Sequence, residues 1–409
     1  MIKIFIKIIQ YILKQLARLT IWRYQPGIVG VTGSVGKTST KEAIKAVLGK
    51  HRDVRASAGN FNNELGLPLA ILGSWQKLGG LFFWPRVLAV SFLRLIFKVG
   101  YPEMLVLEYA ADRPGDIKYL LSIARPQIGI ITAVGDIPVH VEFYASPEAV
   151  AREKARLIEQ LPAIGFAVLN IDDETIANLK SQTRAHVTTY GFSQKADVRI
   201  TNFQNKIDGK PVGISFKLEH AGSFVPVRMT GVFGRAQAYS AAAAACVGLI
   251  FGLNLVKIAE ALADYETPAG RMKLLEGVKG TYIIDDSYNA SPLSMHAAIE
   301  TLKELKAKRK VAVLGDMLEI GKYAPEAHEE MGWLAAKVAD ILVTVGPRGK
   351  FIAKAAGEAG LNYKNILSFD TSEEAKKEVQ RIIKKGDLIL LKASRAIGLD
   401  KIVEEIRKI

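Results

Sequence analysis

The chain has 409 residues, of which 49% are hydrophobic and 23% are charged, so it is long enough for two or three domains with buried cores and too apolar to be disordered. The single cysteine, Cys246, excludes a disulfide framework and is typical of a protein kept in the reducing cytoplasm. The formal net charge of +14 indicates an anionic partner, which is a nucleic acid, a membrane surface or a polyanionic substrate.

Residues 1–26 are predicted to form a basic amphipathic helix that binds an anionic membrane surface. The segment contains no acidic residue. At about 100° per residue, one narrow stripe of the helix holds Lys3, Lys7, Lys14 and Arg18. The opposite side holds Ile2, Phe5, Ile9, Leu13 and Leu16. A basic stripe and an apolar face are typical of a helix in the membrane interface. Packing on the protein's own body is the main alternative, and a membrane span is disfavoured because charges interrupt the segment every few positions.

Alternating strands and helices follow the break at Pro26–Gly27 and predict a mostly parallel sheet covered on both faces. The predicted strands are 27–32, 104–108, 128–132 and 166–170, and the predicted helices are 39–48, 147–160, 236–252 and 255–265. Three short segments, 198–200, 213–218 and 224–229, are predicted to form an antiparallel layer against this sheet.

Residues 78–99 form an apolar insert within this region. Pro85, Arg86 and Arg94 interrupt the insert, which argues against a membrane span. A core element would have to bury several large aromatic side chains. We therefore predict a second membrane-interface patch beside the N-terminal helix.

A change of domain is expected near 267–270. Predicted strands at 281–285, 310–314, 341–345 and 388–391, with helices between them, indicate a smaller Rossmann-like unit. The predicted domains are therefore 1–26, 27–269 and 270–409.

A phosphate-binding loop is predicted where Gly30–Ser39 (G-V-T-G-S-V-G-K-T-S) joins the first strand to the next helix. Glycines allow backbone N–H groups to turn toward phosphate oxygens at a helix N-terminus. Lys37 would neutralise the outer phosphates, and the Thr38 hydroxyl would complete a Mg²⁺ shell. The general G-x-x-x-x-G-K-[ST] pattern is not met, because its first glycine falls on Val31. The predicted nucleotide-binding residues are Gly33, Ser34, Gly36, Lys37, Thr38 and Ser39. The fold class is α/β, with a P-loop mononucleotide-binding central domain and a Rossmann-like C-terminal domain.

A series of motifs follows this loop in order along the chain. They are N-F-N-N-E-L-G-L-P-L (60–69), L-E-Y-A-A-D-R-P-G-D-I (107–117), H-V-E-F-Y-A-S-P-E-A-V-A-R-E-K (140–154), G-R-M (270–272), D-D-S-Y-N-A-S-P (285–292) and L-G-D-M-L-E-I-G (314–321). From Gly30 onward the chain resembles the Mur ligases, and most of all those that add D-alanyl-D-alanine to a UDP-N-acetylmuramoyl-tripeptide. The resemblance implies an ATP-dependent, ADP-forming amide ligase of peptidoglycan synthesis that activates a carboxylate as an acyl phosphate.

The same resemblance implies roles for individual residues. Thr38, Glu108 and His140 match positions that hold Mg²⁺, and Lys154 matches a lysine that is carbamylated and helps to organise the second metal region. Arg271 would swing onto the nucleotide when the domains close, Asp286 would hold the ribose, and Gln237 stands where the family has an asparagine that contacts adenine. The catalytic residues implied are Lys37, His140, Lys154 and Arg271. The substrate-binding residues implied are Asn62, Asn63, Tyr288, Asn289, Ser394 and Arg395.

The chain departs from the family pattern in several places. A histidine is lost in 234–240, an Asn-His pair is replaced by Asp112-Arg113, and a glutamate is replaced by Asp400. Relatives are expected to carry an N-terminal domain for the UDP-sugar, whereas about 29 residues precede the loop here. We therefore expect a lipid-linked or membrane-adjacent muramyl peptide at the inner face of the plasma membrane, or a partner protein that supplies the UDP-sugar site.

Two alternatives remain at the level of sequence. One is a Mur-related ligase of the folylpolyglutamate or poly-amino-acid type. The other is a membrane-surface nucleotide-binding protein without ligase activity, against which Glu108, His140, Lys154 and Arg271 argue together. Nucleic acid is not expected as a partner, because the positive charge lies near apolar segments without base-stacking motifs.

Overall fold

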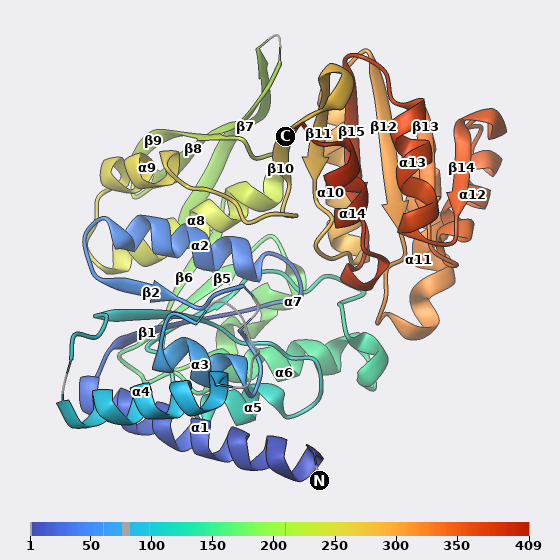
Figure 1. Cartoon of the computed structure of the whole chain (residues 1–409). Coiled ribbons are helices and arrows are strands. Elements are labelled where there is room, and N and C mark those ends of the chain that lie inside the picture. Colours follow the sequence, from blue (N-terminus) through green and yellow to red (C-terminus); the bar gives the residue numbers. More distant parts are fainter. Residues whose placement is uncertain (1, 60, 76–81, 98, 209, 409) are drawn as a thin grey trace.

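The computed structural model describes residues 2–59, 61–75, 82–97, 99–208 and 210–408, and it contains two sheets set side by side (Figure 1). The larger, nine-stranded sheet is formed by β1 (Gly27–Thr32), β2 (Val54–Ala56), β3 (Met104–Glu108), β4 (Ile128–Ile131), β5 (Phe166–Asn170), β6 (His186–Gly191), β7 (Val198–Asp208), β8 (Lys210–His220) and β9 (Ser223–Thr230). Its helices are α1 (Ile2–Tyr24), α2 (Lys37–Gly49), α3 (Gly66–Leu72), α4 (Phe83–Phe97), α5 (Asp116–Leu121), α6 (Pro147–Glu159), α7 (Glu174–Ala177), α8 (Arg235–Ile250) and α9 (Leu255–Ala263).

The order of the larger sheet is β2-β3-β1-β4-β5-β6-β7-β8-β9, parallel from β2 to β7 and antiparallel from β7 to β9. The prediction of a separate antiparallel layer was wrong. Tyr190 of β6 pairs with Val198 of β7, so the antiparallel strands extend the same sheet. Short alternating segments predict strands, but they do not say whether the strands continue an existing sheet edge or stack on its face.

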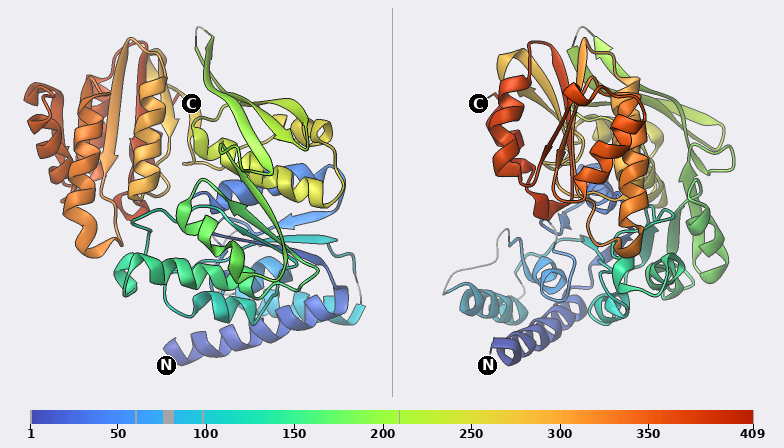
Figure 2. Two further views of the ribbon diagram at one scale, coloured as in Figure 1. Left: turned by 180° about the vertical axis from the view of Figure 1, so that it is seen from behind. Right: turned by 90° about the vertical axis from the view of Figure 1, so that its right-hand side faces the viewer.

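Helices cover both faces of this sheet (Figures 1 and 2). On one face α2 and α8 pack closely, because the side chains of Ala241–Ala245 are small and fully buried. Cys246 follows them and is also buried. On the other face lie α1, α3, α4, α5 and α6. The strand ends on the right of Figure 1 therefore point into the space beside the second sheet.

The second sheet has the order β10-β11-β15-β12-β13-β14, in which only the edge strand β10 is antiparallel. Its strands are β10 (Lys273–Gly277), β11 (Thr281–Asp285), β12 (Arg309–Gly315), β13 (Ile341–Val345), β14 (Ile366–Phe369) and β15 (Asp387–Lys392). Its helices are α10 (Pro292–Glu304), α11 (Ala324–Ala336), α12 (Gly349–Glu358), α13 (Ser372–Ile382) and α14 (Asp400–Ile406). This arrangement confirms the predicted α/β class with a smaller Rossmann-like unit.

Helix α1 packs against the protein body through the side that we predicted to face lipid. Ile9 is 7% exposed, and Leu13 and Ala17 are fully buried against α3 and its neighbours. That part of the prediction was wrong, because an apolar stripe fits a protein core as well as a membrane. None of the described helices is long and apolar enough to cross a membrane.

The predicted insert 78–99 corresponds in part to α4, and its residues 78–81 and 98 lie outside the described residues. Asn60, the first residue of the motif 60–69, also lies outside them. Helix α4 lies beside α1, as predicted, and the Tyr24 hydroxyl donates a hydrogen bond to the Arg94 carbonyl at 2.7 Å.

We expect Leu13→Ala to destabilise the protein by about 2–5 kcal/mol, because it removes a fully buried side chain and leaves a cavity under α1. The measurement is the free energy of unfolding in urea. The control is Leu19→Ala on the same helix, where the side chain is 49% exposed, and we expect a change below about 1 kcal/mol. Equal effects of the two substitutions would contradict the packing of α1.

Candidate active site

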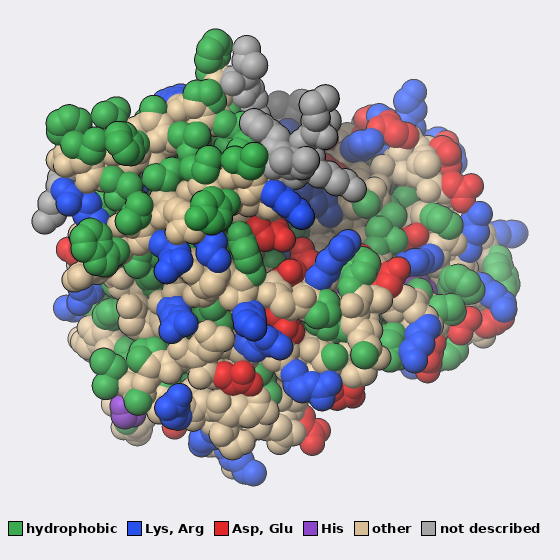
Figure 3. Space-filling model, turned by 90° about the horizontal axis from the view of Figure 1, so that it is seen from below, with side chains coloured by type: hydrophobic (Ala, Val, Ile, Leu, Met, Phe, Trp, Pro, Cys, Tyr) green, Lys and Arg blue, Asp and Glu red, His purple; other side chains and the backbone are tan. Residues whose placement is uncertain are grey.

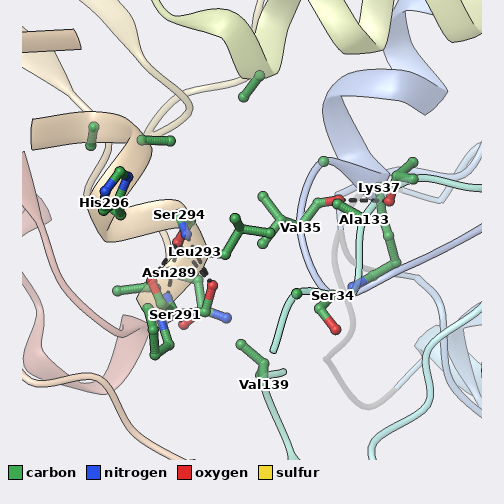
Figure 4. Close-up of a pocket in the computed structure, with 18 of the residues that line it drawn as sticks. Ser34, Val35, Lys37, Ala133, Val139, Asn289, Ser291, Leu293, Ser294 and His296 are labelled. Atoms are coloured by element: carbon green, nitrogen blue, oxygen red, sulfur yellow. Dashed lines mark hydrogen bonds between the residues drawn. The ribbon is translucent and has the colours of Figure 1, made fainter. Parts of the chain in front are cut away.

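A cleft of about 1590 Å³ separates the two sheets and takes its lining from both. Figure 4 shows Ser34, Val35 and Lys37 on one wall, and Asn289, Ser291 and Leu293 on the facing wall. The first wall is the loop between β1 and α2, and the second is the loop after β11 with the start of α10. Loops at the carboxyl ends of parallel strands thus meet across the cleft, which is where α/β folds usually bind ligands.

The loop from Gly33 to Lys37 has the shape that a phosphate site requires. Gly33 has φ +147°, and a Cβ there would lie 2.0 Å from Thr132 Oγ1, so no other residue fits. Gly36 has φ +88° and precedes the first turn of α2. The Ser34 hydroxyl is buried in the cleft wall without a hydrogen-bond partner among the described residues. Together these features fit a bound phosphate chain.

Lys37 lies within this loop, and its Nζ donates to the Gly33 carbonyl at 2.8 Å. Burial lowers the pKa of Lys37, while Glu108 opposes that shift. A partly buried ammonium with one carbonyl partner has unused donors, which are available to an anion entering the cleft.

The predicted metal ligands Thr38 and Glu108 lie together. Glu108 ends β3, and its carboxylate accepts hydrogen bonds from the Thr38 hydroxyl at 3.1 Å and from the Asn62 amide at 3.0 Å. Lys41, which is fully buried, lies 3.7 Å from the same carboxylate. A hydroxyl and a carboxylate next to a phosphate loop are the hard oxygen donors that Mg²⁺ prefers, so these residues fit the ion.

Glu108→Gln is expected to raise the Mg²⁺ concentration needed for half-maximal activity by at least about tenfold, because the neutral amide is a weaker ligand for a hard cation. The measurement is ATP turnover over a Mg²⁺ titration. The control is Glu42→Gln on α2, which removes a carboxylate 3.5 Å from the Lys41 ammonium. This substitution should leave the Mg²⁺ dependence unchanged. An unaltered Mg²⁺ dependence in Glu108→Gln would contradict the role given to Glu108.

His140 lies between two carboxylates from different parts of the chain. Its Nε2 is 3.2 Å from Asp112, and its Nδ1 is 2.8 Å from Glu319 of the C-terminal half. The hydrogen bond with His140 lowers the pKa of Glu319. Asp112, which replaces an asparagine of the family pattern, therefore supplies a carboxylate partner for His140. Within the described ranges, no three His, Cys, Asp or Glu side chains form a cluster that could hold a metal ion by themselves. The metal role of His140 stays a prediction.

Lys154 is buried on α6 beside the phosphate loop, and its Nζ donates to the Gly33 carbonyl at 3.3 Å. Burial lowers its pKa to about 7, and the positive charge of Lys37 adds to the shift. A large fraction of Lys154 therefore carries a neutral amine near neutral pH, which is the form that reacts with CO₂.

Arg271 reaches the loop from the C-terminal half. Its Nη2 is 3.5 Å from Thr38 Oγ1, and its guanidinium lies 4.2 Å from the centre of the Tyr288 ring. Arg395 lies 5.3 Å from the same ring and donates to the Tyr288 hydroxyl at 3.2 Å. The structure thus brings three predicted residues into one cationic group on the second wall.

Several predicted binding residues form hydrogen bonds with other residues of the chain. Gln237 donates to Thr267 and to the Arg271 carbonyl and accepts from Tyr265, so its amide joins α8 to the connection between the sheets. The remaining contacts are Asn63 with the N-terminus of α3, Asn289 with Ala290 N, Ser394 with Leu318 N, and Asp286 with Lys392 and Met272 N. Ser39 is buried at the cleft wall.

Sequence reasoning missed Lys392, which is buried and donates to Asp286 and to the Asn289 carbonyl. It also missed Asp112 and Glu319 as partners of His140. Glu319 lies within the quoted L-G-D-M-L-E-I-G motif and has φ +63°, but only the folded chain places it beside His140. For Lys392, its position as the final residue of a fully buried strand, β15, was the available signal.

Family models match most of the chain. The Mur ligase middle-domain model covers residues 31–77 and 89–248, and the model of the Mur ligase glutamate ligase domain covers 270–395. The chain belongs to the Mur ligase family. It is therefore a ligase of the type that joins an acid to an amino acid or peptide, as the resemblance predicted.

Individual relatives agree with this assignment. The UDP-N-acetylmuramoyl-tripeptide–D-alanyl-D-alanine ligase of Bacillus subtilis is 31% identical over 397 residues, which are 96% of this chain and 79% of that protein. The ligase of the same name from Mycobacterium tuberculosis is 32% identical over 400 residues, which are 93% of this chain and 72% of that protein. Among solved structures, MurF ligase from Thermotoga maritima in complex with ADP superposes with a TM-score of 0.79 at 30% identity, covering 97% of this chain and 83% of that one.

Proposed function

We propose that this Mur ligase couples the terminal carboxylate of a muramyl tripeptide to the amine of D-alanyl-D-alanine, with conversion of ATP to ADP and phosphate. The observation that carries the proposal is the pairing of the two walls: a phosphate loop with Lys37 faces a cationic group of Arg271 and Arg395. Two anions must be brought together in this reaction, and both walls supply positive charge. The relatives from Bacillus subtilis and Mycobacterium tuberculosis are D-alanyl-D-alanine ligases, which supports this choice of amine.

The chemistry follows from these positions. Lys37 and the loop hold the terminal phosphates, while Arg271 closes on them from the second wall. A carboxylate oxygen attacks the terminal phosphorus, and ADP leaves. The amine then attacks the acyl carbon, phosphate leaves, and the amine gives up a proton. Mg²⁺ on Thr38 and Glu108 would offset the charge that collects on the phosphate oxygens. Closure of the cleft keeps water from the acyl phosphate.

Lys154 is proposed to act as a carbamate. Its neutral amine adds to CO₂, one N–C bond forms and one proton is released, so the residue becomes an anion beside the phosphate loop. The lowered pKa and the burial of Lys154 support this step. The anion would replace a cation that otherwise lies next to Lys37 in a poorly solvated place.

We place the reaction in the cytoplasm, as a step of peptidoglycan synthesis that serves cell shape and cell division. We also propose that the chain has three domains, at 1–26, 27–269 and 270–409. The change from the first sheet to the second between β9 and β10 supports the second boundary. The acceptor is proposed to be a UDP-linked or lipid-linked muramyl peptide, with the UDP-sugar held either by this chain or by a partner protein.

The test is an assay with ATP, Mg²⁺, UDP-N-acetylmuramoyl-tripeptide and D-alanyl-D-alanine, with the product identified by mass spectrometry. We expect ADP release to require both substrates and to be matched by pentapeptide. Glutamate and tetrahydrofolate are the control substrates for the folate-type alternative. Turnover with the control pair alone, or ADP release indifferent to any amine, would contradict the proposal. If pentapeptide forms only from a lipid-linked acceptor, the proposed reaction still holds and the muramyl peptide is carried by a lipid.

A further inference from the structure

Helices α1 and α4 present one continuous outer face that carries large exposed hydrophobic side chains. From α1 this outer face takes Ile8, Tyr11, Ile12, Leu19 and Trp22. From α4 and its flanks it takes Phe82, Phe92, Leu93, Ile96, Phe97 and Val99. These are eleven of the twenty large hydrophobic side chains that are exposed in the described part of the chain, so the exposure is concentrated on two helices. Patches of this kind mark interaction sites.

Contacts between α1, α4 and α3 fix the two helices of the outer face relative to each other. The side chain of Tyr24 ties α1 to α4 through the Arg94 carbonyl and stacks on Tyr101 at 4.5 Å between ring centres. The Arg94 guanidinium donates to the Leu72 carbonyl of α3 at 2.8 Å. Seen from below in Figure 3, hydrophobic side chains gather on the left half of this face, with Lys and Arg side chains among and beside them.

The charge of the outer face identifies its partner. Residues 1–36 contain five Lys and Arg, residues 65–102 contain four, and neither segment contains Asp or Glu. Lys7, Arg18 and Arg86 are exposed beside the hydrophobic side chains. A second copy of this chain would bring like charges together, whereas an anionic lipid surface would pair each of them with a phosphate.

We propose that the outer face binds the surface of a bilayer that contains anionic phospholipids, with α1 and α4 lying in the plane of the interface. Trp22 and Tyr11, 73% and 64% exposed, would sit at the level of the headgroups, where amphipathic rings prefer to lie. The lipid-facing side of α1 is thus the one opposite Ile9 and Leu13. The middle-domain family model does not match 1–30 and 78–88, which hold α1 and the start of α4.

Binding in this way leaves the active site open. No described residue that lines the cleft belongs to α1 or α4. A docked molecule would therefore keep the lining of the cleft free of lipid contact. The inference does not depend on the substrate assignment, because the outer face and the cleft share no side chain.

The test is co-sedimentation of the full chain with vesicles of phosphatidylcholine alone, and with vesicles of equal parts phosphatidylcholine and phosphatidylglycerol. We expect at least tenfold stronger binding to the vesicles with phosphatidylglycerol, and weaker binding in high salt. Trp22→Ser with Phe97→Ser should reduce binding at least tenfold. Trp333→Ser, at a position that is 47% exposed on α11, is the matched control and should bind as the unaltered chain does.

Three results would overturn the proposal: no vesicle binding, equal binding to both vesicle types without a salt effect, or a dimer in solution that Trp22→Ser with Phe97→Ser dissociates. ATP turnover in the absence of vesicles should be the same for the unaltered chain and for all of these variants. A failure of membrane binding therefore leaves activity intact, and a failure of the ligase assay leaves vesicle binding intact.

Discussion

Lys37→Ala should lower kcat/KM for ATP-dependent ligation by about 10³-fold or more. The Lys37 ammonium is the cation that the phosphate loop itself supplies, and a positive group fixed on a transferring phosphoryl group contributes on this order. The effect should fall mainly on kcat, because charge on the phosphate oxygens is redistributed most as the phosphoryl group transfers. The measurement is steady-state release of ADP with saturating carboxylate and amine substrates.

The control for this substitution is Lys45→Ala, which removes an exposed lysine from the same helix, α2, and should leave kcat/KM within about twofold. Circular dichroism should show both variants folded. A Lys37→Ala variant that retains a tenth of the activity would show that the terminal phosphates are held elsewhere, and the assignment of the loop would fail.

Lys154→Ala is expected to cost about 10²-fold or more in kcat, because it removes the anion proposed beside the phosphate loop. Lys154→Arg should be as inactive, since a guanidinium keeps the positive charge and does not form a carbamate. A small carboxylic acid such as acetate should restore part of the activity to Lys154→Ala, where it can occupy the vacated volume, and none to Lys154→Arg. Full activity in Lys154→Arg would contradict the carbamate.

The pH dependence of Lys154 follows from its lowered pKa of about 7. Below that value the amine is protonated and does not react with CO₂, and above it the neutral form predominates. A group with this pKa is about 90% neutral amine at pH 8 and about 10% neutral amine at pH 6. We therefore expect the carbamate signal of enzyme equilibrated with ¹³C-bicarbonate, measured by ¹³C NMR, to fall as the pH drops from 8 to 6. A signal that persists unchanged at the lower pH, or is absent at both, would count against the proposal.

The main elements of the fold could be predicted from apolar runs bounded by turns. β3 and β11 have the predicted bounds, 104–108 and 281–285, because each is a short buried run that ends at an acidic residue. The face of α1 was assigned wrongly for a physical reason. Periodicity shows that a helix has two unlike sides, but burial of Leu13 depends on α3, which no local pattern reveals.

The site was predictable to the extent that it is local in sequence. The phosphate loop could be recognised because ten consecutive residues form it. The partners of His140 could not, since Asp112 and Glu319 come from segments that are far apart in the chain and meet only across the cleft. Gln237 was assigned by its position in a motif, whereas its amide bonds to Tyr265, Thr267 and Arg271 depend on how the two sheets are joined.

The central claim is that the acceptor carboxylate is activated by phosphoryl transfer before the amide forms. The most direct measurement is ligation with a muramyl tripeptide whose terminal carboxylate carries ¹⁸O at both oxygens, followed by mass spectrometry of the released phosphate. We predict one ¹⁸O atom in each phosphate, because the acyl–oxygen bond breaks when the amine attacks. Phosphate that contains only the oxygens of ATP and water, released while amide forms, would contradict an acyl phosphate and with it the roles given to both walls of the cleft.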